Sequence, residues 1–186
     1  MRRPARWARL WGVSERPNRH VILLGLMGAG KTTVGSALAV RLGVPLRDSD
    51  TDLLASTGET ARQLRDSRGV DALHALESEH LLGSMAVPDG AVICAAAAVA
   101  DDPRCVELLR RTQDIVVWLE VPPEVLAARF AREPHRPAYG AETVAFLTAQ
   151  AARREPVYRS VADVVVVAGP GNSGAEVETI LAALRA

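Results

Sequence analysis

Short runs of apolar residues alternate with longer segments of helical periodicity along most of this chain. The runs that read as buried strands span residues 21–24, 45–47, 91–94, 114–119 and 163–167. Strands that alternate with helices are typical of a parallel sheet, because each crossover helix packs back onto the sheet. The pattern therefore predicts a three-layer α/β/α domain with a mostly parallel, five-stranded sheet.

The helical segments between these strands carry recognisable start and stop signals. One of them ends at Gly43, and another follows the pair Pro122 and Pro123. Glycine is frequent just after a helix because it adopts the left-handed conformation readily, and proline is favoured in a first helical turn. The predicted helices span residues 33–42, 70–85, 124–131 and 175–184.

A glycine-rich segment, residues 25–32, lies between the first predicted strand and the first predicted helix. It reads GLMGAGKT and fits the pattern G-x-x-x-x-G-K-[ST]. Its glycines let backbone N–H groups point at phosphate oxygens, Lys31 supplies a positive charge, and the Thr32 hydroxyl is suited to ligate Mg²⁺. Other glycine-rich turns between strands and helices have no need for the Lys-Thr pair. The segment therefore predicts binding of a nucleoside triphosphate.

Length, charge and cysteine content narrow the class of function. The 186 residues suit one domain with a core of its own. The 22 Lys and Arg residues balance 22 Asp and Glu residues, so no basic field favours nucleic acid or an anionic membrane. Cys94 and Cys105 form no disulfide scaffold, and no apolar run approaches the ~20 residues that span a bilayer. We expect a cytoplasmic protein that acts on a small molecule.

Residues 1–19 differ from the rest of the chain, and we interpret them as an extension of a single domain, residues 20–186. The extension holds six arginines without the apolar stretch of a secretory signal. Trp7, Leu10 and Trp11 can share one face of a short helix that docks on the domain or on a partner. A disordered extension is the other interpretation.

Two aspartates follow the second predicted strand, at the edge of the sheet that also carries the phosphate loop. The segment reads Asp48-Ser49-Asp50, and strand alternation is expected to send both carboxylates to one side. Phosphoryl transfer uses one carboxylate in the Mg²⁺ shell and another near the acceptor hydroxyl, which suits Asp48 and Asp50. The alternative is that Asp48, Asp50 and Asp52 only begin a helix, where acidic residues are favoured.

Together these motifs resemble the shikimate kinase family, small P-loop kinases that are similar to the nucleoside monophosphate kinases. The resemblance covers almost everything after residue 20. The matching segments read GLMGAGKTTVG, GVPLRDSDTDLLASTG, GVDALHALE, VICAAAAV, VWLEV, HRPAY and ARREPVYR. The resemblance implies a P-loop NTPase fold with a small lid near residues 132–140, ATP and Mg²⁺ as cofactors, and phosphorylation of a cyclic polyol acid.

Carried over to this chain, the resemblance implies roles on the nucleotide side. Lys31 and Thr32 serve the phosphates and Mg²⁺, and Asp48 belongs to the metal shell. Arg136 matches a lid arginine that stabilises transition-state charge, and Arg129 matches an arginine near adenine or phosphate. The implied nucleotide-binding residues are Gly25, Gly28, Ala29, Gly30, Lys31, Thr32, Thr33, Arg129 and Arg136.

On the acceptor side, Asp50 is implied to bind the acceptor hydroxyls and to accept the proton. It is then catalytic together with Lys31 and Arg136. Arg154 matches the arginine that grips the substrate carboxylate. A solvated charge on a helix face is the alternative for Arg154, because Arg153 beside it fits the motif equally well.

The chain departs from the family at two acceptor-side places. His74 stands where the family has an arginine, and Ala95, Ala96 and Ala97 stand where it has three glycines. Histidine offers fewer donors and is mostly neutral near pH 7, so we expect carboxylate binding to weaken by about 1.5 to 3 kcal/mol. Each alanine adds a methyl group to the pocket floor and disfavours the left-handed conformation. For His74 the other interpretation is a helix histidine without a binding role; Glu77, one turn later, can orient its imidazole.

We therefore predict an ATP-dependent kinase that phosphorylates a hydroxyl of shikimate or of a related cyclic polyol. One alternative is a kinase for another small acceptor, such as a sugar acid, a cyclitol or a nucleoside. Another is a nucleotide-binding module without acceptor chemistry, although Asp50, Arg136 and Arg154 argue against it. We expect a monomer or a weak homodimer, without a nucleic-acid or membrane partner.

Overall fold

The computed structural model describes residues 19–130, 140–169 and 174–185. In these ranges five strands form one sheet in which all neighbouring strands are parallel. The strands are β1 (Val21–Leu24), β2 (Leu46–Asp48), β3 (Val92–Cys94), β4 (Ile115–Glu120) and β5 (Val164–Val167). Their order is β2-β3-β1-β4-β5, so the strand that leads into the phosphate loop is central.

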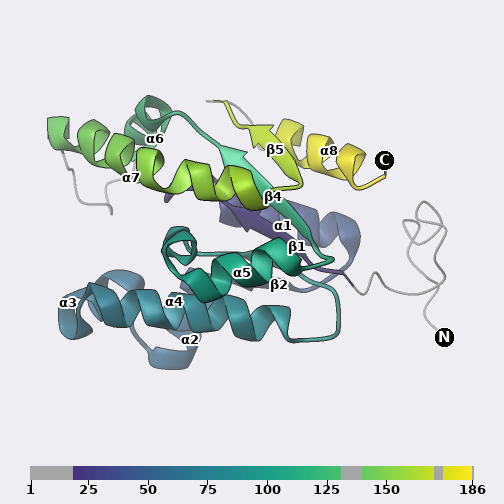
Figure 1. The fold of residues 1–186 in the computed structure, drawn as a ribbon, viewed down its shortest axis with the longest axis horizontal. Helices are drawn as coiled ribbons and strands as arrows, with labels where there is room; N and C mark the ends of the chain where they lie inside the picture. Colours follow the sequence, from purple (N-terminus) through teal and green to yellow (C-terminus); the bar gives the residue numbers. More distant parts are fainter. Residues whose placement is uncertain (1–18, 131–139, 170–173, 186) are drawn as a thin grey trace.

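Helices form a layer on each face of this sheet. On one face, α1 (Lys31–Leu42) packs against β1, β2 and β3 and against α8 (Gly174–Ala183). On the other face, α4 (Val70–Met85), α5 (Pro103–Arg111) and α7 (Gly140–Val161) lie side by side, toward the viewer in Figure 1. The remaining helices are α2 (Ser49–Thr57), α3 (Ala61–Arg68), the 3₁₀ helix η2 (Ala97–Asp101) and α6 (Pro123–Phe130). The predicted three-layer α/β/α architecture is confirmed.

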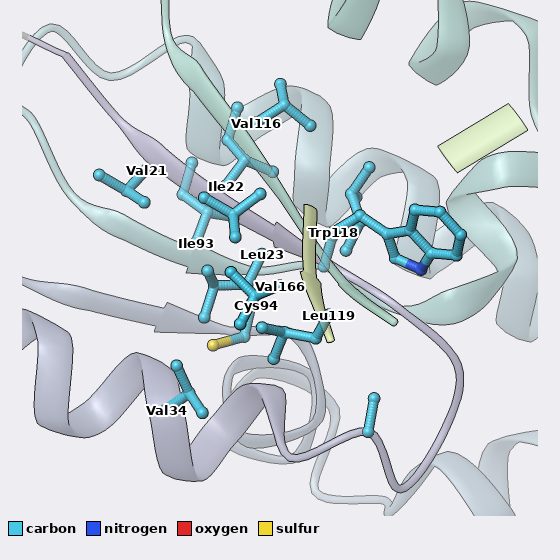
Figure 2. Close-up of a cluster of buried hydrophobic side chains, with 14 of the residues drawn as sticks. Val21, Ile22, Leu23, Val34, Ile93, Cys94, Val116, Trp118, Leu119 and Val166 are labelled. Carbon is cyan, nitrogen blue, oxygen red and sulfur yellow. The ribbon is translucent and has the colours of Figure 1, made fainter. Parts of the chain in front are cut away.

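The core lies on both sides of the central strands. Ile22 of β1 is in register with Ile93 of β3, and both are fully buried. The neighbouring residues Leu23 and Cys94 point to the opposite face, toward α1, where Figure 2 shows Val34 beside Cys94. Successive residues of a strand point to opposite faces, so Trp118 of β4 can pack under α7, where its ring lies 6.1 Å from that of Tyr158. This packing fixes the strand ends, and therefore the loops that follow them.

All five predicted strands begin and end within one or two residues of their expected positions. The four predicted helices do so as well, and one of them, α4, has the predicted bounds. Helices α3, α5 and α7 and the turn η2 were not predicted, and α2 corresponds to the helix that was the alternative interpretation of Asp48, Asp50 and Asp52. Pro156 lies inside α7 and removes a backbone donor there, which disguises the helix in the sequence. Among the residues of α3 only Leu64 is buried, so its apolar period is weak.

Several expectations concern segments beyond the described ranges. Residues 1–18 of the expected extension, and residues 131–139 with most of the expected lid and Arg136, lie outside the described residues. Within the described ranges, no helix combines the length and the apolar character needed to cross a bilayer.

Candidate active site

The loop between β1 and α1 has the backbone of a phosphate-binding loop. Gly25, Gly28 and Gly30 have φ angles of 147°, 80° and 97°, which residues with side chains rarely adopt. Helix α1 begins at Lys31; no side chain caps its first turn, and that turn contains no acidic residue. Its free N–H groups and the positive end of the helix dipole favour a phosphate at this position.

The ammonium group of Lys31 is folded onto this loop. Its Nζ donates hydrogen bonds to the carbonyls of Gly25 at 2.8 Å and of Leu26 at 3.0 Å. Removal from water lowers the pKa of Lys31, and nearby acidic groups, Cys94 and Asp50 foremost, oppose the shift. The cation therefore lies where phosphate oxygens can replace the two carbonyls as its partners.

Thr32 and Asp48 meet at the carboxyl edge of the sheet. Thr32 Oγ1 donates a hydrogen bond to Asp48 Oδ2 at 2.8 Å. The other carboxylate oxygen, Oδ1, accepts from the N–H and the hydroxyl of Thr51, both at 3.1 Å, and so caps α2. Asp48 is buried, and three donors orient its carboxylate.

This pair fits a Mg²⁺ ion that is held mainly by phosphates. Mg²⁺ commonly binds one or two protein oxygens and takes its other ligands from phosphates and water. In the part of the chain that the structure describes, no group of three or more His, Cys, Asp or Glu side chains could hold a metal ion alone. Thr32 and Asp48 are thus the residues that would hold the ion, which would supply positive charge to the phosphates.

Asp50 is not part of a strand, and the expected strand alternation from Asp48 to Asp50 is wrong. Strand β2 ends at Asp48, and Asp50 lies in the first turn of α2. The chain turns into the helix immediately after its cap, so helix geometry places the second carboxylate. Asp50 is exposed, and its charge influences the pKa values of Lys31 and Glu77. Asp50 is thus an exposed carboxylate close enough to Lys31 to affect its pKa.

Arg129 of α6 reaches the phosphate loop. Its Nη1 donates to the carbonyl of Gly28 at 3.0 Å, and its Nη2 donates to the carbonyl of Gly169 at 2.7 Å. Nη1 also lies 3.8 Å from the position that a Cβ atom on Gly30 would take. The guanidinium group therefore joins the loop to the segment after β5 and lies beside the expected phosphates.

Arg154 of α7 is buried and bonded to a carboxylate of this chain. A single oxygen of Asp101, Oδ2, accepts from Arg154 Nε at 3.0 Å and from Nη2 at 2.6 Å. Arg153 donates to the same oxygen. The side chain of Arg154 is 9% exposed and that of Arg153 is 56% exposed. The description of a solvated charge on a helix face therefore applies to Arg153 and not to Arg154.

His74 and Glu77 of α4 adjoin Arg154. Desolvation and the charge of Arg154 lower the pKa of His74, which keeps its imidazole neutral near pH 7. Desolvation, reinforced by Asp50, raises the pKa of the buried Glu77 to about 7, against the opposing charges of Arg154 and Lys31. No hydrogen bond joins Glu77 to His74, although both side chains belong to the described residues. The expectation that Glu77 orients the imidazole is therefore not met.

The three alanines after β3, which were expected to line the pocket floor, are not all accessible. Ala95 is buried, and its N–H donates to the carbonyl of Leu23 at 3.1 Å, so it continues the sheet. Ala96 and Ala97 are partly exposed, and Tyr158 of α7 donates a hydrogen bond to the carbonyl of Ala97 at 2.8 Å. Among the described residues only glycines have positive φ. The segment therefore enters η2 without the left-handed conformation that alanine disfavours.

Asp101 and Tyr158 contribute to this region without having been predicted. Asp101 belongs to an Asp-Asp-Pro run, which reads as a helix start, and its partner Arg154 is 53 positions away in the sequence. Tyr158 follows Arg154 by four residues and so shares its helical face. The four-residue spacing from Arg154 could therefore have indicated that Tyr158 lies in this region. No comparable sequence signal pointed to Asp101.

Known proteins of one family match almost the whole domain. The family model for shikimate kinase matches residues 27–185. The shikimate kinase of Aromatoleum aromaticum is 34% identical over 169 residues, 89% of this chain and 94% of that protein. The shikimate kinase of Thermobifida fusca is 35% identical over 154 residues, 83% of this chain and 87% of that protein.

A solved structure agrees with these sequence matches. The shikimate kinase from Acinetobacter baumannii, in complex with shikimate, has a TM-score of 0.82 to this chain at 28% identity. The similarity covers 91% of this chain and 94% of that chain. The matched region includes the phosphate-loop residues Lys31 and Thr32, Asp48 and the whole acceptor side, and the chain belongs to the shikimate kinase family of phosphotransferases.

Proposed function

We propose that this chain is an ATP-dependent kinase that transfers the γ-phosphoryl group to a hydroxyl of shikimate or of a related cyclic polyol. Its relatives are shikimate kinases, and the A. baumannii protein is in complex with shikimate. The contact between Thr32 and Asp48 beside Lys31 carries the proposal, since it supports a metal site next to a phosphate site. Mg²⁺ is the proposed metal, and a cytoplasmic monomer or weak homodimer is the proposed form.

On the nucleotide side, the loop and the first turn of α1 would bind the β and γ phosphates. Lys31 would neutralise their charge, while Thr32 and Asp48 would hold Mg²⁺. Arg129 would support the loop, and Arg136, which lies outside the described residues, is the proposed lid arginine. Charge develops on the oxygens around the transferred phosphorus, so fixed positive groups lower the energy of the transition state.

On the acceptor side, Asp50 would orient the reacting hydroxyl and take its proton as the oxygen bonds to the γ phosphorus and ADP leaves. His74, Ala96, Ala97 and Arg154 would contact the rest of the acceptor. Lid closure would exclude water, which otherwise competes with the hydroxyl for the phosphoryl group.

A coupled assay of ADP release with ATP and Mg²⁺ tests this function. Shikimate is compared with a panel of cyclitols, sugars, sugar acids and nucleosides. ADP release that depends on shikimate or on a cyclitol is the expected result. Turnover with another acceptor alone would correct the substrate, and ATP binding without turnover on any acceptor would favour a nucleotide-binding module.

Two variants test the roles of the charged groups. Lys31→Ala is expected to lower turnover by about 10²- to 10³-fold or more, because it removes fixed charge at the phosphates. Asp50→Asn is expected to keep ATP binding and to lower kcat by about 10²- to 10⁴-fold. Asp52→Asn is the matched control, since Asp52 lies in the same helix but pairs with His80. An Asp50→Asn protein with normal kcat would refute the proposed base.

A further inference from the structure

A hydrogen bond between a histidine and an aspartate joins α2 to α4, which lie against each other (Figure 1). Nε2 of His80 on α4 donates to Oδ2 of Asp52 on α2 at 2.8 Å. An ionised carboxylate only accepts, so Nε2 carries the proton of this bond. The side chain of His80 is 9% exposed, and its Nδ1 is buried without a hydrogen-bond partner among the described residues. Water therefore replaces this bond poorly if it is lost.

The apolar packing of α2 leaves its rotation poorly defined. Leu53 is the one buried apolar side chain of this nine-residue helix, and it packs with Leu64 of α3 and Leu73 of α4. Apolar contacts have no directional preference, and a helix of this length is not stable by itself. The rotation of α2 about its axis therefore depends on directional contacts. The structure shows two of them, the cap at Asp48 and the bond from His80.

The bond from His80 also determines where Asp50 lies. Residues two positions apart differ by about 200° around an α-helix, so Asp50 and Asp52 lie on different sides of α2. Asp52 is directed at α4, whereas Asp50 is exposed. A rotation of α2 that released Asp52 would turn Asp50 by the same angle. The charge of Asp50 would then move relative to Lys31 and Glu77, whose pKa values it influences.

We propose that His80 is a positioning residue for phosphoryl transfer, which holds Asp52 and so fixes the rotation of α2 that directs Asp50 at the acceptor hydroxyl. This inference rests on the proposed kinase function and on Asp50 as its base. A base must lie within hydrogen-bond reach of the proton that it takes, and a displacement of about 1 Å can lower a rate about hundredfold. His80 acts through Asp52 and Asp50 and touches neither substrate.

Steady-state kinetics of the full chain test this inference, with ATP, Mg²⁺ and shikimate or the acceptor that the panel identifies. His80→Leu fills the buried position with an apolar side chain and removes the donor. Its kcat is expected to fall about tenfold to hundredfold. Its KM for ATP is expected to change less than about threefold, because the phosphate loop is not part of α2. Asp52→Ala removes the same bond from the other side and is expected to give the same split.

Two conservative variants restore the bond. His80→Gln keeps an N–H donor near the position of Nε2, and Asp52→Asn keeps an oxygen that accepts it. Both are expected to keep kcat within about threefold of the wild type, so Asp52→Asn remains a valid control for Asp50→Asn. Glu79→Leu is the matched control for His80→Leu. Glu79 is the neighbour of His80 on α4, with its side chain 61% exposed, and its replacement is expected to leave kcat unchanged.

A double variant decides whether His80 acts through Asp50. The base is already lost in Asp50→Asn, so the addition of His80→Leu is expected to lower kcat by less than about threefold in that background. A merely structural role for His80 would lower kcat by the same factor with and without Asp50. Denaturant unfolding of each variant identifies the folded ones. Asp52→Ala takes the place of His80→Leu if the latter does not fold.

The outcomes separate this inference from the kinase function. A folded His80→Leu protein with kcat within about threefold of the wild type would overturn the inference and leave the kinase function standing. Equal losses with and without Asp50, or losses that neither conservative variant restores, would have the same meaning. ATP binding by the wild type without turnover of any acceptor would overturn the proposed function and this inference with it.

Discussion

Thr32 of α1 and Asp48 at the end of β2 are joined by a hydrogen bond of 2.8 Å. The same Asp48 carboxylate caps α2 through Thr51, and α2 carries Asp50 in its first turn. One side chain therefore orients the proposed metal site and also fixes the helix that places the proposed base. The two halves of the reaction centre share this anchor, so changes at Asp48 are expected to affect both.

Substitution of Asp48 separates its charge from its capping role. Asn caps helices about as well as Asp, so Asp48→Asn is expected to stay within about 0.5 kcal/mol of the wild type in stability. Asp48→Ala loses the cap and is expected to lose about 1 kcal/mol. Both variants are expected to need about tenfold or more Mg²⁺ for half-maximal activity, because the charged ligand is gone. Denaturant unfolding and Mg²⁺ titration of the rate measure these effects, and an unchanged Mg²⁺ requirement in Asp48→Asn would contradict the metal role.

Gly35 allows α1 to approach β3. A Cβ atom on Gly35 would lie 2.3 Å from Cys94 Sγ and 3.3 Å from a methyl carbon of Leu23. The helix must shift to admit it, so Gly35→Ala is expected to cost about 1 to 3 kcal/mol of unfolding free energy. Chemical denaturation measures this cost.

A double variant tests the steric origin of that cost. Cys94→Ala removes the sulfur that the new methyl group meets, so Gly35→Ala combined with Cys94→Ala is expected to be more stable than the two single effects predict. Strict additivity of the two costs would show that the contact with Cys94 does not cause the destabilisation.

The raised pKa of Glu77 predicts that the free energy of unfolding depends on pH. Its pKa is raised from 4.5 to about 7 in the folded chain, so the folded state binds more protons than the unfolded state between these values. Stability is therefore lost as the pH rises through this window, because the buried carboxyl must ionise. Glu77→Gln removes the loss. Between about pH 5 and about pH 8, the variant is expected to gain about 1 to 3 kcal/mol relative to the wild type.

Thermal or denaturant unfolding at the two pH values measures this gain. Glu79→Gln is the matched control, because Glu79 lies on the same helix with its side chain 61% exposed. The change in the stability of Glu79→Gln between the two pH values is expected to equal that of the wild type. If Glu77→Gln also follows the wild type at both pH values, the carboxyl does not titrate in this range.

The contacts of Arg129 with the phosphate loop predict that this side chain supports ATP binding. Its side chain joins the carbonyls of Gly28 and Gly169 and lies beside the loop. Arg129→Ala removes two charge-assisted hydrogen bonds, and the KM for ATP is expected to rise about tenfold or more at saturating acceptor. Arg111→Ala, which removes an arginine that is 80% exposed and paired with Glu107, is the control. An unchanged KM for ATP in Arg129→Ala would exclude a role at the phosphates.

Elements with strong local patterns were predictable, and elements that depend on packing were not. Val21–Leu24 and Val70–Met85 occur as expected, since their apolar spacing reflects one buried face. Helix α7 escaped prediction because Pro156 interrupts its pattern, and its stability comes from contacts with α5, α6 and β4. The strand-like alternation expected from Asp48 to Asp50 was wrong because Asp48 caps α2, so the chain is already helical at Asp50.

The sequence by itself determined the fold class and the family, and it predicted the nucleotide side of the site. The phosphate loop lies within eight consecutive residues, 25–32, and local backbone geometry is enough to aim their N–H groups. Only the tertiary structure decided the acceptor side. Asp101 and Arg154 are far apart in the chain, and their ion pair exists because η2 packs against α7. The charge that an acceptor meets depends on that packing, and no local pattern records it.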